Sequence, residues 1–206
     1  MKTGTLYLVP VPLAEQAASK SFMPFVVETI NAIDTYIVEN EKTARKFLKE
    51  AGLQRPQSEL IIHDYGKHKR SSSLAPFFKE LMGGKDVGLM SEAGCPGIAD
   101  PGADVVAEAH RRGIKVVPLV GPNSILLALM ASGFNGQSFT FHGYLPIDKI
   151  QRGKRIKELE QLAQKYQQTQ LFIETPFRNN QLLEDVLKNA MPQTLLCVAC
   201  NLTGED

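Results

Sequence analysis

The chain has 206 residues, of which 43% are hydrophobic and 22% charged, and its formal net charge is +1 at pH 7. This composition excludes an intrinsically disordered chain, and the length suits one large domain or two small ones. The near-neutral charge excludes a uniformly basic nucleic-acid binder, so contact with nucleic acid would need a local basic patch.

Cysteine usage and the apolar stretches together predict a cytoplasmic protein without a membrane span. The three cysteines, Cys95, Cys197 and Cys200, are an odd and sparse set, which is typical of a reducing compartment. Residues 1–10 have the pattern of a strand rather than of an export signal. The most apolar stretch, residues 116–130, is interrupted by prolines and a glycine and cannot cross a bilayer as one helix.

In the first two thirds of the chain, short apolar strands alternate with helical patterns, which predicts an α/β fold. Asn40 is expected to cap a helix that Gly52 ends, and Pro24 suits the first turn of the preceding helix. The expected strands are residues 6–9, 35–38, 59–63, 87–90 and 115–120. The expected helices start near residue 21, at residue 40, at residues 71–73, at residue 103 and at residue 124.

The apolar density drops at residues 133–137, which predicts an N-terminal α/β domain over residues 1–134 and a C-terminal α/β domain over residues 135–206. In the second domain we expect strands at residues 139–141, 171–173 and 195–199, and a helix at residues 148–166. A further helix after Pro176 is expected to bury Leu182, Leu183, Val186, Leu187 and Ala190.

Two loops that lead from a strand into a helix are candidates for ligand binding. Residues 91–102 follow an apolar strand and contain three glycines and two prolines, and residues 121–123 form a shorter loop of the same kind. Ligands of open α/β sheets bind at the carboxyl ends of strands, where small residues let the backbone approach closely. The spacing matches neither a dinucleotide fingerprint nor a P-loop. A rigid connection without a ligand, and a capping role for Ser124, are the alternatives.

Five ordered blocks in this region carry a resemblance to a known family. The blocks are residues 87–102, 117–125, 131–134, 139–146 and 172–178. They are similar to the small-subunit ribosomal RNA 2′-O-ribose methyltransferase I branch of the tetrapyrrole methylase superfamily. The resemblance implies a two-domain α/β fold with S-adenosylmethionine in the cleft between the domains, and S-adenosylhomocysteine as the product. It also implies ribosomal RNA or the small ribosomal subunit as substrate, and a homodimer.

Carried over position by position, the resemblance implies a set of cofactor contacts made largely by backbone groups and small side chains. The implied cofactor-binding residues are Pro10, Gly94, Cys95, Ile98, Ser124, Ile125, Glu174 and Ala199. Cys95 replaces a Thr or Asp that relatives often carry, so we expect its small size to be kept and its hydrogen bond to differ.

The first third of the chain departs from the family pattern. Residues 39–42 read Glu-Asn-Glu-Lys where relatives carry Glu-Asp-Thr-Arg, and relatives continue beyond the position of Asp206, so the second sheet is expected to be truncated or reduced. The departure leaves two alternatives open, a corrin or porphyrin C-methyltransferase and a cofactor-binding homologue without catalysis. Glu92, Glu39 and Lys42 are candidates for proton transfer, and no catalytic residue is assigned.

Three further patterns concern charge, cysteine and histidine. A basic cluster could contact phosphates or could be a solvated helix face. Its members are Lys67, Lys69, Arg70, Lys149, Arg152, Lys154, Arg155 and Lys157. The CxxC spacing of Cys197 and Cys200 is interpreted as two buried structural thiols within a strand. The four histidines have no ligand spacing, so no metal is expected.

Overall fold

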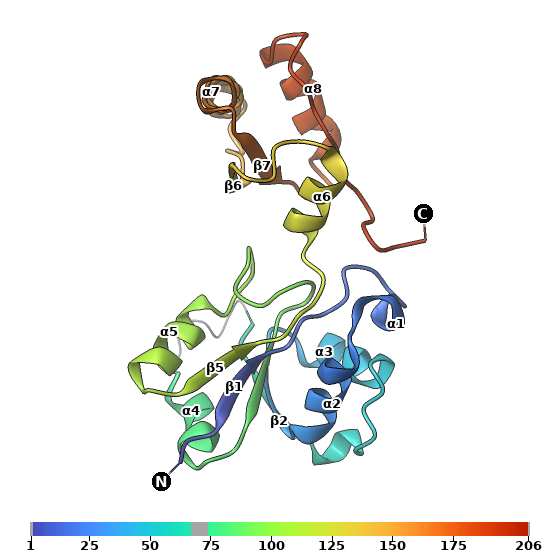
Figure 1. Cartoon of the computed structure of the whole chain (residues 1–206), viewed down its shortest axis with the longest axis vertical. Coiled ribbons are helices and arrows are strands. Elements are labelled where there is room, and N and C mark those ends of the chain that lie inside the picture. Colours follow the sequence, from blue (N-terminus) through green and yellow to red (C-terminus); the bar gives the residue numbers. More distant parts are fainter. Residues whose placement is uncertain (1, 67–73, 206) are drawn as a thin grey trace. The chain divides into compact units, whose positions relative to one another are not determined.

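The computed structural model describes residues 2–66 and 74–205, and it divides into two compact units (Figure 1). The first unit is Met1–Ser124 with Asn201–Asp206, and the second is Ile125–Cys200. The division therefore falls after Ser124 and not after residue 134, because almost all of the helix that starts at Ser124 belongs to the second unit. None of the helices in the described part of the chain is long and apolar enough to cross a membrane.

A five-stranded parallel sheet forms the centre of the first unit, with the strand order β3-β2-β4-β1-β5. The strands are β1 (Thr5–Leu8), β2 (Thr35–Val38), β3 (Ile61–Asp64), β4 (Val87–Met90) and β5 (Lys115–Pro118). Every residue of β2 and β4 is buried, as expected for strands that have helices on both faces. The predicted α/β class is confirmed.

Helices cover both faces of this sheet (Figure 1). They are α1 (Ala18–Ser21), α2 (Pro24–Ala32), α3 (Glu41–Glu50), α4 (Ala75–Met82) and α5 (Ala103–Arg111), with a 3-10 turn at Gln57–Glu59. On one face Ile30 of α2 and Phe47 of α3 pack in a core with Tyr36, and on the other Phe78 of α4 and Val105 of α5 pack with Leu6. Burial of these side chains is the main force that holds the helices on the sheet.

Local signals in the sequence set the helix ends as predicted. The Asn40 side chain accepts hydrogen bonds from the backbone N–H groups of Lys42 and Thr43, at 2.9 and 3.2 Å. Gly52 follows α3 with φ of +87°, a conformation that suits glycine. Pro24 is the first residue of α2. The predicted start of α4 at residues 71–73 lies outside the described residues.

The second unit contains a two-stranded parallel sheet of β6 (Phe139–Tyr144) and β7 (Thr169–Ile173). Its helices are α6 (Ser124–Ser132), α7 (Lys149–Tyr166) and α8 (Asn179–Asn189). Asp148 caps α7 by accepting a hydrogen bond from the backbone N–H of Gln151 at 2.9 Å. The core is small and consists of Leu145, Ile156, Leu159 and Leu182 with partly buried neighbours.

Three predictions for the second unit are wrong. Residues 195–199 form no strand, and Cys197 and Cys200 are exposed rather than buried. An apolar segment becomes a strand only where a neighbouring strand takes its hydrogen bonds, and residues 195–199 have none among the described residues. Leu183 and Leu187 of α8 are also exposed, because the helix turns its Leu182 and Asp185 side inward.

A buried ion pair joins α7 to α8. Arg152 is 2% exposed, and its Nε and Nη2 atoms lie 2.8 and 2.5 Å from Oδ2 of Asp185. Its Nη1 atom donates to the backbone carbonyls of Pro146 and Ile147, at 3.2 and 2.7 Å. Arg152 therefore holds the start of α7 in place, and neither of the two alternatives for the basic cluster, contact with phosphates or a solvated helix face, applies to it.

The cap at Asn40 gives a first prediction. Asn40→Ala removes the acceptor for two backbone N–H groups and should lower the free energy of unfolding by about 1 kcal/mol. Asn40→Asp keeps the acceptor and should change it little. Urea denaturation of the three proteins measures the difference, and equal loss in both variants would show that the cap does not act through the side-chain oxygen.

The buried pair gives a second prediction. Asp185→Ala leaves the Arg152 guanidinium buried without its counter-charge and should lower the free energy of unfolding by about 3–5 kcal/mol. Arg152→Met combined with Asp185→Leu removes both charges and should recover most of this loss. The comparison is made by urea denaturation. A double variant as unstable as Asp185→Ala would contradict the prediction.

Candidate cofactor-binding loops

Three loops meet at the carboxyl edge of the large sheet. They follow β1, β4 and β5, which are neighbours in the order β4-β1-β5. Val11, after β1, donates its N–H to the carbonyl of Gly94, after β4, at 2.9 Å, and the Gly94 N–H returns a bond to the Val11 carbonyl at 2.8 Å. This two-way bridge fixes the first two loops to each other.

The third loop packs equally closely. A Cβ atom placed on Gly121 would lie 2.2 Å from Cβ of Pro10, so glycine is required where the β5 loop meets the β1 loop. The Cys95 thiol lies 3.4 Å from the carbonyl of Pro122 and donates to it. Gly94 has φ of +70°, and a Cβ atom there would lie 3.4 Å from the Leu13 side chain. The three loops therefore form one cluster of small residues and backbone.

The β4 loop is also folded on itself. The Gly97 N–H donates to the carbonyl of Pro101 at 3.1 Å, and the Ile98 N–H donates to that of Cys95 at 3.2 Å. Gly102 is the N-cap residue of α5 and has φ of +128°, and a Cβ atom there would lie 3.0 Å from the Leu89 side chain. The glycines thus allow a compact turn. A loop that is already ordered loses little conformational freedom when a ligand binds.

The structure brings together four of the predicted cofactor residues in this cluster. Pro10 and Gly94 are buried, Cys95 is half-buried, and Ile98 is 49% exposed. Ser124 lies just after the β5 loop and is exposed. It is the first residue of α6 and directly follows Asn123.

The other three predicted residues belong to the second unit. Ile125 is half-buried in α6, and Ala199 is exposed in an irregular segment rather than in the expected strand. Glu174 follows β7, and its Oε1 atom accepts hydrogen bonds from the Thr175 N–H at 2.7 Å and from Arg178 Nη2 at 2.6 Å. The Glu174 carboxylate thus orders the start of α8.

The candidates for proton transfer lie near the carboxyl edge of the large sheet. Glu92 is exposed, and its Oε1 atom accepts a hydrogen bond from the Thr43 hydroxyl at 3.3 Å. Glu39 lies between β2 and α3, and Lys42 is in the first turn of α3. No sequence motif marks Thr43, because its contact with Glu92 joins residues 49 positions apart. Among the described residues, no group of three or more acidic, histidine or cysteine side chains could hold a metal ion.

Burial raises the pKa of the Cys95 thiol, and a hydrogen bond with the Asn123 side chain partly opposes this. The thiol therefore stays protonated at neutral pH and acts as a small donor to the Pro122 carbonyl. Cys95 is suited to packing and hydrogen bonding rather than to nucleophilic attack.

A parallel sheet with close-packed, glycine-rich loops at its carboxyl edge is typical of α/β proteins that bind ligands at this edge. Comparison with curated proteins identifies the family within it. The Ribosomal RNA small subunit methyltransferase I of Synechocystis sp. is 32% identical over 200 residues, which cover 97% of this chain and 67% of the relative. That of Thermotoga maritima is 32% identical over 79% of this chain and 68% of its own length. The chain therefore belongs to the ribosomal RNA small subunit methyltransferase I family, within the tetrapyrrole methylases.

Two further comparisons concern the length of the match and the fold. The Bacillus subtilis member is 35% identical over 87% of this chain, and the chain spans 58% of that protein's length. A conserved hypothetical protein from Aeropyrum pernix, known from a crystal structure, superposes with a TM-score of 0.61 at 16% identity, covering 91% of this chain and 65% of that one, and shows the same fold. No family model matches the chain.

The raised pKa of Cys95 gives a third prediction. At about pH 8 iodoacetamide should alkylate Cys95 several-fold more slowly than the exposed Cys197 and Cys200, because a raised pKa and burial lower the supply of reactive thiolate. The Cys95 rate should keep rising at higher pH. Mass spectrometry of timed samples measures each site, and unfolding in guanidinium should remove the difference. A Cys95 that reacts first in the folded protein would contradict the assignment.

Proposed function

We propose that the chain transfers a methyl group from S-adenosylmethionine to a ribose 2′-hydroxyl of small-subunit ribosomal RNA. Family membership carries this proposal, since the relatives are named as ribosomal RNA small subunit methyltransferases. The names do not favour the corrin or porphyrin alternative. As the resemblance implies, we also propose that the protein acts in the cytoplasm as a homodimer.

The three-loop cluster of the first unit fits the proposed cofactor. Pro10, Gly94, Cys95 and Ile98 offer backbone groups and small or apolar side chains, and the loops are interlocked by hydrogen bonds. S-adenosylmethionine supplies an electrophilic methyl group on a sulfonium. The loops would hold the cofactor in a fixed orientation, and alignment of donor and acceptor accounts for much of the acceleration in such displacements. All eight cofactor-binding assignments stay predictions, those of Pro10, Gly94, Cys95 and Ile98 as well as those of Ser124, Ile125, Glu174 and Ala199.

Transfer to a ribose hydroxyl also requires a group that takes the hydroxyl proton. Glu92 is an exposed carboxylate at the start of the β4 loop, and the Thr43 hydroxyl orients it. Glu39 and Lys42 lie after the neighbouring strand β2. These three residues are the candidates for that role, and substitution of each, with methyl transfer as the readout, separates them.

The loop packing gives a fourth prediction. Gly121→Ala places a methyl group against Pro10 and should weaken S-adenosylhomocysteine binding by about tenfold, or 1.4 kcal/mol. Gly136→Ala is the matched control, because a Cβ atom there meets nothing within 4 Å. Isothermal titration calorimetry measures both variants, with thermal unfolding as a check of the fold.

The same preparation tests the acceptor. Labelled S-adenosylmethionine is incubated with the protein and either under-methylated small ribosomal subunits or a tetrapyrrole precursor. Label in the ribosomal RNA supports the proposal, and label in the tetrapyrrole supports the alternative. Binding of the cofactor without transfer to either would support a homologue that has lost catalysis. A wild-type protein that binds neither S-adenosylmethionine nor S-adenosylhomocysteine would refute the proposed function.

A further inference from the structure

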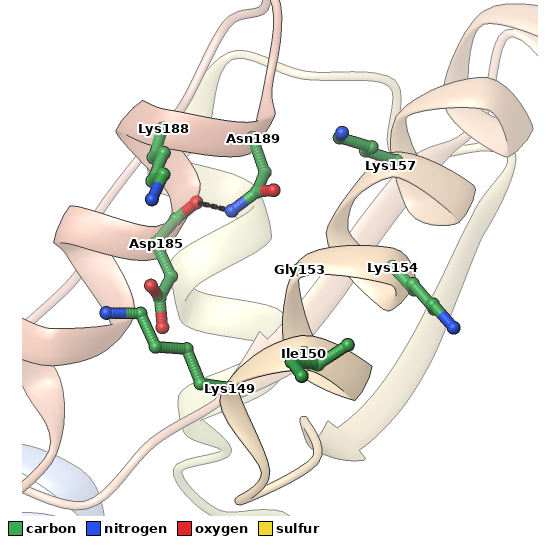
Figure 2. Close-up of a pocket in the computed structure, with 8 residues that line it drawn as sticks. All are labelled: Lys149, Ile150, Gly153, Lys154, Lys157, Asp185, Lys188 and Asn189. Atoms are coloured by element: carbon green, nitrogen blue, oxygen red, sulfur yellow. Dashed lines mark hydrogen bonds between the residues drawn. The ribbon is translucent and has the colours of Figure 1, made fainter.

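A groove in the second unit runs between α7 and α8 and has a volume of about 300 Å³ (Figure 2). Lys149, Lys154 and Lys157 of α7 and Lys188 of α8 line it, together with Gly153 and Asn189. Figure 2 shows Lys149, Lys157 and Lys188 extending around the space beside Asp185 and Asn189, whereas Lys154 points away from it. We call this feature the α7–α8 lysine groove.

The groove is positively charged. Among the described residues, Asp185 is the one acidic residue that lines it, and the buried Arg152 guanidinium already neutralises that carboxylate, with Nε and Nη2 at 2.8 and 2.5 Å. In the part of the chain that the structure describes, none of the four lysines forms an ion pair. The positive charges of Lys149, Lys157 and Lys188, which extend around the space, are therefore available to a ligand that carries negative charge.

Specific contacts between α7 and α8 fix the space between the two helices. Gly153 faces Asn189, and a Cβ atom on Gly153 would lie 3.0 Å from Oδ1 of Asn189. The Asn189 side chain is held by donating from Nδ2 to the Asp185 carbonyl at 2.8 Å. A glycine backbone and a fixed amide thus form the wall, and the Arg152–Asp185 pair fixes the two helices.

The arrangement of the lysines suits a chain of phosphates. Lys149 and Lys157 are eight residues apart on α7, which is about 12 Å along the helix axis. One inorganic anion does not span that distance. The groove also has no aromatic side chain among its lining residues and is at the small end of pockets for organic ligands. Lysine ammonium groups bind phosphates as point charges without reading a base sequence.

We propose that the α7–α8 lysine groove binds the phosphate backbone of the RNA substrate. The proposal rests on the proposed function, because it takes ribosomal RNA to be the substrate. The groove contributes affinity and positioning without sequence specificity, and none of the predicted cofactor residues lines it.

The fifth prediction tests this surface by charge reversal. Lys157→Glu combined with Lys188→Glu should weaken binding of a fluorescent single-stranded RNA of about 20 nucleotides by tenfold or more at low salt. The slope of log affinity against log salt should fall by roughly 0.7 for each lost phosphate contact. Fluorescence anisotropy over a series of salt concentrations measures both quantities.

The matched control reverses two exposed lysines outside the groove. Lys115→Glu combined with Lys165→Glu changes the net charge equally and should weaken binding much less, without the change in slope. Equal losses in the two double variants would show that only bulk charge matters and would overturn the proposal. If charge reversal unfolds the second unit, Lys157→Gln combined with Lys188→Gln repeats the test.

S-adenosylhomocysteine titration separates the two proposals. The groove variants should bind S-adenosylhomocysteine as the wild type does. Groove variants that bind RNA as tightly as the wild type would refute the RNA-binding role of the groove, even if the wild type transfers methyl groups. If the wild type does not bind S-adenosylhomocysteine but the groove variants lose RNA affinity, the methyltransferase function is refuted and the RNA-binding role of the groove is supported.

Discussion

The backbone bridge between Val11 and Gly94 is the contact on which the candidate cofactor site depends. It joins the loop after β1 to the loop after β4, and β1 lies between β4 and β5 in the sheet. Hydrogen bonds continue the pairing to the strand ends, from Val9 N–H to Leu89 O and from Leu119 N–H to Leu8 O. Gly94 permits the bridge because its φ of +70° is accessible to glycine at little cost.

The second unit is held together by different means. Its sheet has two strands and its core is small, so less apolar burial is available to fix the helices. Arg152 and Asp185 form a specific ion pair between α7 and α8. The carbonyls of Pro146 and Ile147 accept hydrogen bonds from Nη1 of the Arg152 guanidinium. A buried pair of this kind specifies a geometry more than it adds stability.

The three-loop cluster of the first unit and the α7–α8 lysine groove of the second unit suit two different ligands. Interlocked backbone loops present small, fixed hydrogen-bonding groups, which match a compact cofactor. Exposed lysines along two helices present charges on flexible stems, which match a polymer of phosphates whose sequence is not read. The proposed methyltransferase would need both, since the donor must be held rigidly while a long acceptor is positioned by many weak contacts.

The sequence by itself determined the α/β class, the apolar strand at residues 87–90, the Asn40 cap and the glycine-rich loop after that strand. Each of these follows from local patterns, namely apolar runs, capping residues and glycine at turns. Only the tertiary structure decided that Arg152 is buried, that residues 195–199 form no strand, and that Thr43 orients Glu92. These outcomes depend on which distant segment supplies a counter-charge, a hydrogen-bonding neighbour or a side-chain partner, and a local pattern holds no information about that segment.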